Sequence, residues 1–340
     1  MGFFDRLWPR KRAMPVQETA QMRALLDRLV VLSPSLKLAR DYRERLCPAL
    51  AQSIAYVHDI VERLPPAREA SAANWLDDPY IHAFFAAPDE ISLVLSRSPE
   101  LHAWFESHSL VSETWAVLGM AMMERRGFGV GRHGDEVHTD VAQTTLSFDD
   151  HQVRVCGESE ADLREHIVQR VVEQIALEGL AQIGADESRR DALEQERALL
   201  RTRRQLLTRQ GAGTQRMVGE RAIENAAELA QLQASIEANE QALAALGLKT
   251  DALEHEMDVI CGVLADPARH ANVEMKHVRL SPMNIVIERD ARSNGAEIVF
   301  PLARLPASPQ GVRAFSLIRF ARSDLMPLPK VLDEDSRFII

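Results

Sequence analysis

The chain has 340 residues, of which 46% are hydrophobic, 26% charged and 5% aromatic, and its formal net charge is -10. No apolar run approaches the roughly 18 residues of a membrane-spanning helix, and the widely spaced, odd-numbered cysteines exclude a disulfide framework or a C-x-x-C site. The composition therefore predicts a cytoplasmic globular protein, and the negative charge argues against nucleic acid as a partner.

The first predicted region, residues 1–14, is a basic amphipathic segment in which large apolar side chains alternate with cations. Its apolar members are Phe3, Phe4, Leu7 and Trp8. A segment of this kind makes weak contact with an anionic membrane surface, so a peripheral location is an alternative to a purely cytoplasmic one. The competing interpretation is a terminus that docks on the protein itself.

Residues 15–130 are predicted to form a helical domain. Proline residues separate its expected helices, which span Gln17–Leu32, Ser35–Leu64, Asp89–Ser96, Pro99–Ser107 and Ser112–Arg126. The region holds three of the four tryptophans, so we expect an ordinary packed core here.

Residues 131–158 are predicted to form a β-hairpin, with strands at 143–148 and 152–156 around a polar turn at Asp149-Asp150. The same region carries four side chains of metal-binding type, namely His133, Asp135, His138 and Asp140. Imidazole and carboxylate groups bind zinc, manganese or iron. Their spacing matches no standard metal motif, however, and a polar loop is the competing interpretation. We predict no cofactor.

Residues 159–265 are predicted to form an antiparallel coiled-coil hairpin. Apolar or small polar residues recur at spacings of three and four from Leu229 to Leu264, with Asn239 and Thr250 as polar members of the seam. Gly211-Ala212-Gly213 is expected to form the turn between equal arms at 159–210 and 214–265. The register passes through Gly247, which is therefore expected inside one helix. Paired at that turn, Gly179 and Gly247 fall at the same height and predict an elbow.

The tip of this hairpin is basic. Residues 197–216 contain six arginines and no acid, and the candidate partner-binding residues among them are Arg197, Arg201, Arg204 and Arg209. The competing interpretation is ion pairing across the arms with Glu220, Glu224 and Glu228. Leu193, Leu200 and Leu207 form an apolar stripe in the first arm, with Leu199 and Leu206 beside it.

Residues 266–326 are expected to supply the remaining strands of a sheet domain, before a tail at 327–340. Strand patterns span Val273–Leu280, Asn284–Glu288, Ala296–Leu305 and Arg313–Arg322. The predicted fold class is α+β and predominantly helical. It comprises an N-terminal helical domain and a small antiparallel sheet that carries the coiled-coil hairpin as an insertion.

No coherent catalytic set is present in the sequence. We therefore expect a non-enzymatic interaction or scaffolding protein that binds a protein partner, or itself as a homodimer, through the coiled coil. The alternative is an enzyme, metal-dependent or not, with a polar site around residues 133–140 between the helical domain and the sheet.

Overall fold

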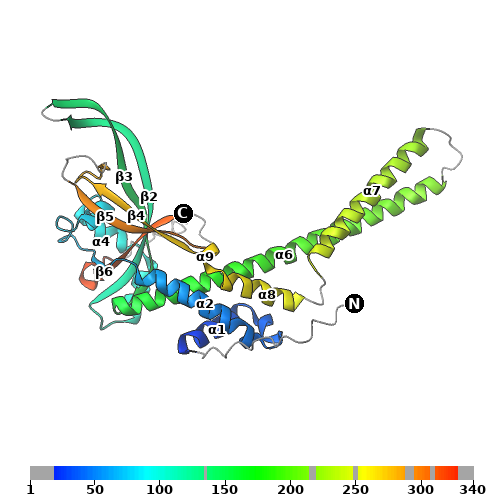
Figure 1. Cartoon of the computed structure of the whole chain (residues 1–340), viewed down its shortest axis with the longest axis horizontal. Helices are drawn as coiled ribbons and strands as arrows, with labels where there is room; N and C mark the ends of the chain where they lie inside the picture. Colours follow the sequence, from blue (N-terminus) through cyan, green and yellow to red (C-terminus); the bar gives the residue numbers. More distant parts are fainter. Residues whose placement is uncertain are drawn as a thin grey trace, which may run out of the picture. The chain divides into compact units, whose positions relative to one another are not determined.

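A computed structural model of the chain describes residues 19–133, 136–213, 220–247, 252–287, 295–306 and 311–327 (Figure 1). The fold is α+β and mostly helical, with an antiparallel sheet and a long helical hairpin, which confirms the predicted fold class. Two compact units divide the chain. We call residues 53–174 and 267–340 the sheet unit, and residues 1–52 and 175–266 the hairpin unit.

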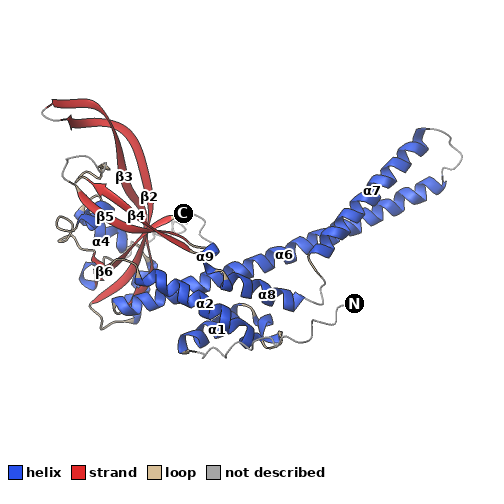
Figure 2. Cartoon of the chain, in the orientation of Figure 1, coloured by secondary structure: helices blue, strands red, loops and turns tan. Residues whose placement is uncertain are grey.

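The sheet unit is built on a sheet whose antiparallel strands follow the order β3-β2-β6-β5-β4 (Figure 2). These strands are β2 (Glu113–His133), β3 (Glu136–Gly157), β4 (Asn272–Leu280), β5 (Ala296–Arg304) and β6 (Arg313–Ala321). The short β1 (Arg68–Glu69) pairs in parallel with β6. Three of the predicted C-terminal strands are thereby confirmed, whereas residues 284–287 contribute only isolated bridges.

The predicted helix Ser112–Arg126 is wrong, because β2 occupies this segment. Its first half pairs with β3 on one side and β6 on the other, and Ala116, Leu118 and Met120 are buried. A short apolar run rich in Ala, Leu and Met has helical propensity, yet periodicity cannot distinguish a buried helix from a central strand. The hydrogen bonds to neighbouring strands on both sides therefore make this segment a strand.

The predicted turn at Asp149-Asp150 is also wrong, because β3 continues through it to Gly157. Asp150 adopts a positive φ of 49°, and the β2–β3 register shifts between Gly119 and Ala121. These features mark a β-bulge, in which an extra residue is accommodated without ending the strand. The polar pair therefore marks an irregularity in one long strand and does not separate two short ones.

The two faces of the sheet are covered differently. One face packs against α3 (Pro79–Phe84), α4 (Pro88–Leu95) and α5 (Pro99–Ser107) through a large core that includes Phe84 and Phe300. On the other face, a smaller cluster gathers Val117, Leu163 and Leu317 beside the end of α2 and the start of α6. The first face is filled by aromatic side chains, whereas the second is covered only in part.

The start of α6 is fastened to the end of α2 by one side chain. The Arg164 guanidinium donates to the carbonyl oxygens of Leu64 at 3.0 Å and Pro65 at 3.3 Å, and it pairs with Glu160 at 2.7 Å. These carbonyls lie at a helix end, where intrahelical partners are missing. Arg164 therefore holds the two segments together over the partly covered face.

The hairpin unit consists of helices. They are α1 (Ala20–Leu32), the 3₁₀ helix η1 (Pro34–Leu38), the first part of α2 (Tyr42–Glu62), most of α6 (Glu160–Gly213), α7 (Glu220–Ala245) and α8 (Ala252–Ala265). The predicted single helix Ser35–Leu64 is broken before α2, where Asp41 has a positive φ of 53°. Arg45 of α2 donates to Glu254 and Asp258 of α8 at 2.7 Å each.

The arms of the hairpin differ from the predicted ones. Helix α6 continues through Gly211-Ala212-Gly213, so the predicted turn is wrong and the connection falls at residues 214–219, outside the described residues. The second arm ends its first helix at Ala245, and Gly247 has a φ of 77°. Glycine adopts this left-handed conformation without steric cost, which makes it a common helix stop. The prediction of one helix through Gly247 is therefore wrong.

The predicted elbow rests on Gly179 and Gly247 lying at the same height, and this premise is wrong. Gly179 lies against Ile260 and Val263 of α8, whereas the Gly247 carbonyl accepts a hydrogen bond from Arg190. The two glycines are at different heights because the connection lies later than Ala212 and the second arm is interrupted. Helix α6 is continuous at Gly179, so a break exists in one arm only.

Candidate functional site

The seam of the hairpin lies between α6 and α7, which run side by side in Figure 1. On α7, the predicted heptad positions from Leu229 to Leu246 are the buried or half-buried ones, and Leu232 and Ile236 are almost fully buried. The facing positions on α6 alternate arginine with leucine, as Arg190, Leu193, Arg197, Leu200, Arg204 and Leu207. The predicted coiled-coil face is confirmed over α7, and its partner strip is half polar.

Arginines of α6 make most of the polar contacts between the arms. Arg190 donates to the carbonyls of Leu246 and Gly247 at 2.6 and 2.9 Å, where α7 ends and its carbonyls lack intrahelical partners. Cross-arm ion pairs join Arg201 to Glu240 and Arg203 to Glu228, at 2.6 Å each. Arg204 donates to Gln233 at 2.6 Å.

The predicted partner-binding arginines therefore have different surroundings. Arg201 and Arg204 are engaged within the hairpin, Arg197 is half-buried in the seam, and Arg209 is exposed. Cross-arm pairing includes Glu228, as the competing interpretation expected, while the side chains of Glu220 and Glu224 lie outside the described residues. Partner binding by these arginines stays a prediction.

Asn239 is a buried polar residue in the middle of the seam, with 5% of its surface exposed. Its Nδ2 donates to the Leu193 carbonyl at 3.1 Å and to Glu196 at 3.0 Å. Its buried Oδ1 has no hydrogen-bond partner among the described residues. A buried asparagine in a coiled coil fixes the register at a cost in stability, because other registers leave more of its polar atoms unpaired.

A second stripe of α6 faces away from the seam and carries no charge. We call it the outer stripe; its members are all exposed and spaced three or four apart, as Ala185, Ser188, Ala192, Gln195, Leu199, Thr202 and Leu206. Leu199 is 72% exposed and Leu206 54%. The hydroxyls of Ser188 and Thr202 donate to the carbonyls of residues 184 and 198 at 2.9 Å, which satisfies them within the helix. The outer stripe therefore presents mainly apolar surface.

The exposed side of α7 carries a matching set of small residues. We call it the alanine stripe, and it consists of Ala227, Ala230, Ala234, Ala238, Gln241 and Ala245. Small side chains allow another helix to approach closely, because interhelical distance depends on the residues at the contact. The hairpin thus offers a leucine-bearing face on one arm and a face of small residues on the other. Leu199 and Leu206 were apparent from the sequence as apolar residues beside the first-arm stripe, whereas the charge-free spacing around them was not predicted.

The candidate metal ligands occupy the end of the β2–β3 hairpin. In the backbone register His133 pairs with Glu136 and His138 pairs with Gly131, while Asp140 is exposed on β3. The side chains of His133, Asp135 and His138 lie outside the described residues. In the described part of the chain, no cluster of three His, Cys, Asp or Glu side chains is placed to hold a metal ion. The metal site stays a prediction.

The basic amphipathic segment with Phe3, Phe4, Leu7 and Trp8 also lies outside the described residues. Over the described ranges, no helix combines the length and apolar character needed to cross a membrane.

Fold and surface thus define an α+β protein in which one unit is built on an antiparallel sheet and the other contains a pair of amphipathic helices. Comparison with protein-family models, with curated proteins and with solved structures gave no match. The function is therefore argued from this chain alone.

Proposed function

We propose that this chain is a non-enzymatic interaction or scaffolding protein whose helical hairpin binds a second copy of itself or a protein partner. The observation that carries the proposal is the outer stripe, where Leu199 and Leu206 are exposed one heptad apart on a charge-free face. Burying a leucine side chain stabilises an association by about 1.5–3 kcal/mol. The solvent-exposed face of a helix usually carries charged residues. The absence of charge over about six turns of the outer stripe therefore favours a binding surface.

A second copy of the chain is the occupant that the hairpin fits best. The leucines of the outer stripe and the small residues of the alanine stripe are complementary in size, as packed helix layers require. In a two-fold symmetric dimer each copy supplies both stripes, so the same contact forms twice. The product is a four-helix bundle, an arrangement in which each helix buries more than one face.

The mass of the full chain in solution tests this proposal. Sedimentation equilibrium is expected to show a dimer at micromolar concentrations, and Leu199→Glu with Leu206→Glu is expected to make it monomeric. Because both side chains are exposed in one copy, the double variant retains the fold, which circular dichroism verifies. Val31→Glu with Leu38→Glu is the matched control, since these side chains are also about three-quarters exposed, at 77% and 75%.

Two results contradict self-association: a monomeric wild type at the highest soluble concentration, or a dimer that survives the Leu199 and Leu206 changes. In the first case the remaining occupant is a helical protein partner. It is then sought by crosslinking from residue 199 or 206 to purified candidate proteins, and attachment confined to these positions supports the same surface.

A further inference from the structure

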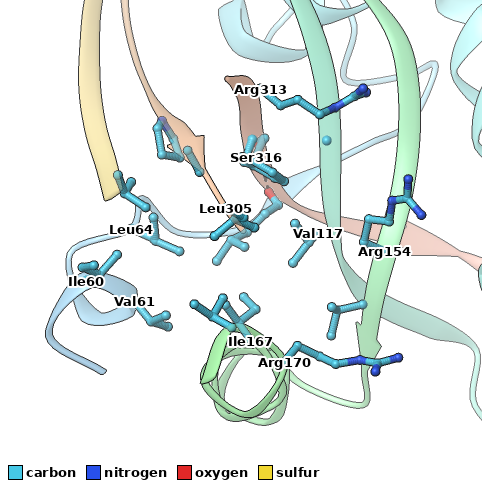
Figure 3. A pocket seen from close by; sticks show the side chains of 18 of the residues that line it. Ile60, Val61, Leu64, Val117, Arg154, Ile167, Arg170, Leu305, Arg313 and Ser316 are labelled. Atoms are coloured by element: carbon cyan, nitrogen blue, oxygen red, sulfur yellow. Dashed lines mark hydrogen bonds between the residues drawn. The ribbon is translucent and has the colours of Figure 1, made fainter. Parts of the chain in front are cut away.

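The sheet unit contains a cavity of about 610 Å³ over the partly covered face of its sheet (Figure 3). Every described residue that lines it belongs to the sheet unit. Val117 of β2 points into it, whereas its neighbours Ala116 and Leu118 point into the aromatic core on the other face. The cavity exists because α2 and α6 cover less of this face than α3, α4 and α5 cover of the other.

Most of the cavity wall is apolar. Figure 3 shows Ile60, Val61 and Leu64 on one side, with Ile167 of α6 and Leu305 facing them across the space. The volume lies inside the range of about 300–1,000 Å³ that small-molecule sites occupy. An apolar space of this size, kept open between a sheet and two helices, fits a flexible hydrocarbon chain.

Arginine predominates among the charged side chains of the wall. The described lining residues include four arginines, namely Arg68, Arg154, Arg170 and Arg313, and one acid, Glu100, while Arg68 is paired with Asp78 at 3.2 Å. This excess of positive charge stands in a chain whose formal net charge is -10. Clustered cations in a low-dielectric wall attract anions, so the ligand is expected to carry negative charge.

Two of these arginines, Arg154 and Arg170, have side chains that are more than half exposed. Arg313 is buried and pairs with Asp150 at 2.8 Å. The Arg154 side chain is 60% exposed, hydrogen-bonds the neutral amide of Gln152, and stands 4.0 Å from Glu100. Arg170 is similarly exposed and contacts Glu173 at 3.3 Å. Each guanidinium has five N–H donors, so Arg154 and Arg170 retain capacity for an added carboxylate.

The side chains of Arg154 from β3 and Arg170 from α6 extend along the same side of the apolar cluster in Figure 3. Arg68 also lines the cavity, and its buried Nε–H has no acceptor among the described residues. A buried donor without a partner is rare in folded proteins, and a ligand oxygen is one way to satisfy it. The wall therefore combines hydrocarbon with donors for oxygen.

We infer that this cavity binds a long-chain fatty acid, with the carboxylate on Arg154 and Arg170 and the hydrocarbon chain between Val117, Ile167 and Leu305. Guanidinium groups bind carboxylates through two parallel hydrogen bonds, which fixes the head of the ligand at one edge. The inference is independent of the hairpin, because the hairpin unit contributes no described residue to the cavity.

Calorimetric titration of the full chain with oleate, below the concentration at which oleate aggregates, tests this inference. We expect saturable binding of about one oleate per chain. Oleyl alcohol and octanoate are expected to bind at least about tenfold more weakly, because the first lacks the charge and the second most of the apolar chain. Equal binding of oleyl alcohol, or the absence of saturation, overturns the inference. Tighter binding of a lysophosphatidate overturns the carboxylate assignment in favour of a phosphate head group.

Amino-acid substitutions test whether oleate binds in this cavity. Arg154→Gln with Arg170→Gln is expected to weaken oleate at least about tenfold, whereas Arg126→Gln, at an exposed cation of β2, leaves it unchanged. Val273→Trp places a large ring in the wall of the cavity and is expected to weaken binding by reducing the space for the hydrocarbon chain. Leu110→Trp, at a side chain 98% exposed outside the cavity, is its control. Undiminished binding by the folded Val273→Trp variant overturns the inference, and the comparison of oleate with oleyl alcohol applies even if a variant fails to fold.

Discussion

The α6–α7 hairpin and the sheet unit are stabilised in different ways. In the sheet unit the rings of Phe84, Phe148 and Phe300 meet edge to face, with centroids 5.0 to 6.3 Å apart. Between α6 and α7 one seam carries the packing, with a buried asparagine and a row of arginines in it. No aromatic residue occurs between positions 148 and 300.

The difference shows how each region leaves surface for other molecules. Each helix of a two-helix element buries one stripe, so the remaining stripes stay exposed and are available to a partner. A sheet has two faces, and here one face forms the core while the other is only partly covered. Five predictions test this difference between the two regions.

The largest expected effect on stability is in the aromatic core. Phe84→Ala is expected to lower the free energy of unfolding by about 3–5 kcal/mol, because it removes a fully buried ring at the centre of the cluster. Leu110→Ala, at an exposed side chain, is expected to change it by less than about 0.5 kcal/mol. Guanidinium denaturation measures both. A change below about 1 kcal/mol for Phe84→Ala contradicts a core centred on these rings.

Cysteine reactivity is expected to report the burial of Cys156 in the sheet. Burial raises the pKa of the Cys156 thiol from 9.0 to about 12, and burial also raises the pKa of Cys261 in α8. The thiolate is the reactive form, so alkylation of Cys156 at pH 8 is expected to be about a thousandfold slower in the folded than in the unfolded chain. Mass spectrometry of iodoacetamide-treated protein measures the rate. Fast labelling of native Cys156 contradicts its burial in the sheet.

Asn239→Leu is expected to stabilise the hairpin by about 1–2 kcal/mol, because it removes a buried oxygen that lacks a hydrogen-bond partner among the described residues. Amide hydrogen exchange across α7 measures the local effect. Gln231→Leu, at an exposed position of the same helix outside the seam and the alanine stripe, is the control. Faster exchange in Asn239→Leu indicates that the contacts of Asn239 with Leu193 and Glu196 stabilise the hairpin more than the unpaired oxygen weakens it.

Two glycines of the hairpin unit are expected to respond in opposite directions. Gly247→Ala is expected to destabilise the hairpin by about 1 kcal/mol, because Gly247 has a φ of 77° that L-residues disfavour. Gly184→Ala is expected to stabilise α6 by about 0.5–1 kcal/mol, since Gly184 is helical and an added methyl group meets open space. Thermal unfolding followed by circular dichroism measures both. Stability changes of the same sign in the two variants contradict a helix break that is confined to the second arm.

The smallest expected effect is a loss of stability in acid that involves His151. This ring stacks on Phe85 at 4.8 Å and its Nε2 donates to the Phe84 carbonyl at 2.8 Å. Burial lowers the pKa of His151 below its ordinary value of 6.5. The unfolded chain therefore binds the proton first, and the stabilising contribution is complete above pH 6.5 and declines as the pH falls toward the folded pKa.

Unfolding at pH 7.5 and pH 5.5 measures this effect. His151→Gln is expected to lose less stability on acidification than the wild type, because it removes the group whose pKa is lowered by folding. If His151→Gln and the wild type lose equal stability between the two pH values, the result contradicts the assignment of this effect to His151.

Local sequence patterns were sufficient wherever one surface of an element decides its structure. The heptad positions of α7 follow from the spacing of Leu232, Ile236 and Asn239, because a helix seam has a fixed period. The strands β4, β5 and β6 follow from alternation and flanking turn residues. Pro99 begins α5, as predicted from the position of proline at the first residue of a helix.

The sites were harder to predict. The outer stripe could in principle be predicted from the sequence, since its members lie on one helix and none of them is charged. The cavity could not be predicted from the sequence. Its lining residues come from distant segments that only the folded sheet unit brings together, among them Ile60, Val117, Ile167 and Leu305. Neither a motif nor a spacing connects such residues.

The sequence by itself determined the composition, the helical hairpin and its seam, because a periodic apolar face follows from the residues of one segment. Tertiary structure alone decided that β2 is a strand, that β3 passes through Asp150, and where the arms of the hairpin pair. In each of these cases the local propensities permit two structures. The choice depends on hydrogen bonds and packing with distant segments, whose positions a single sequence does not specify.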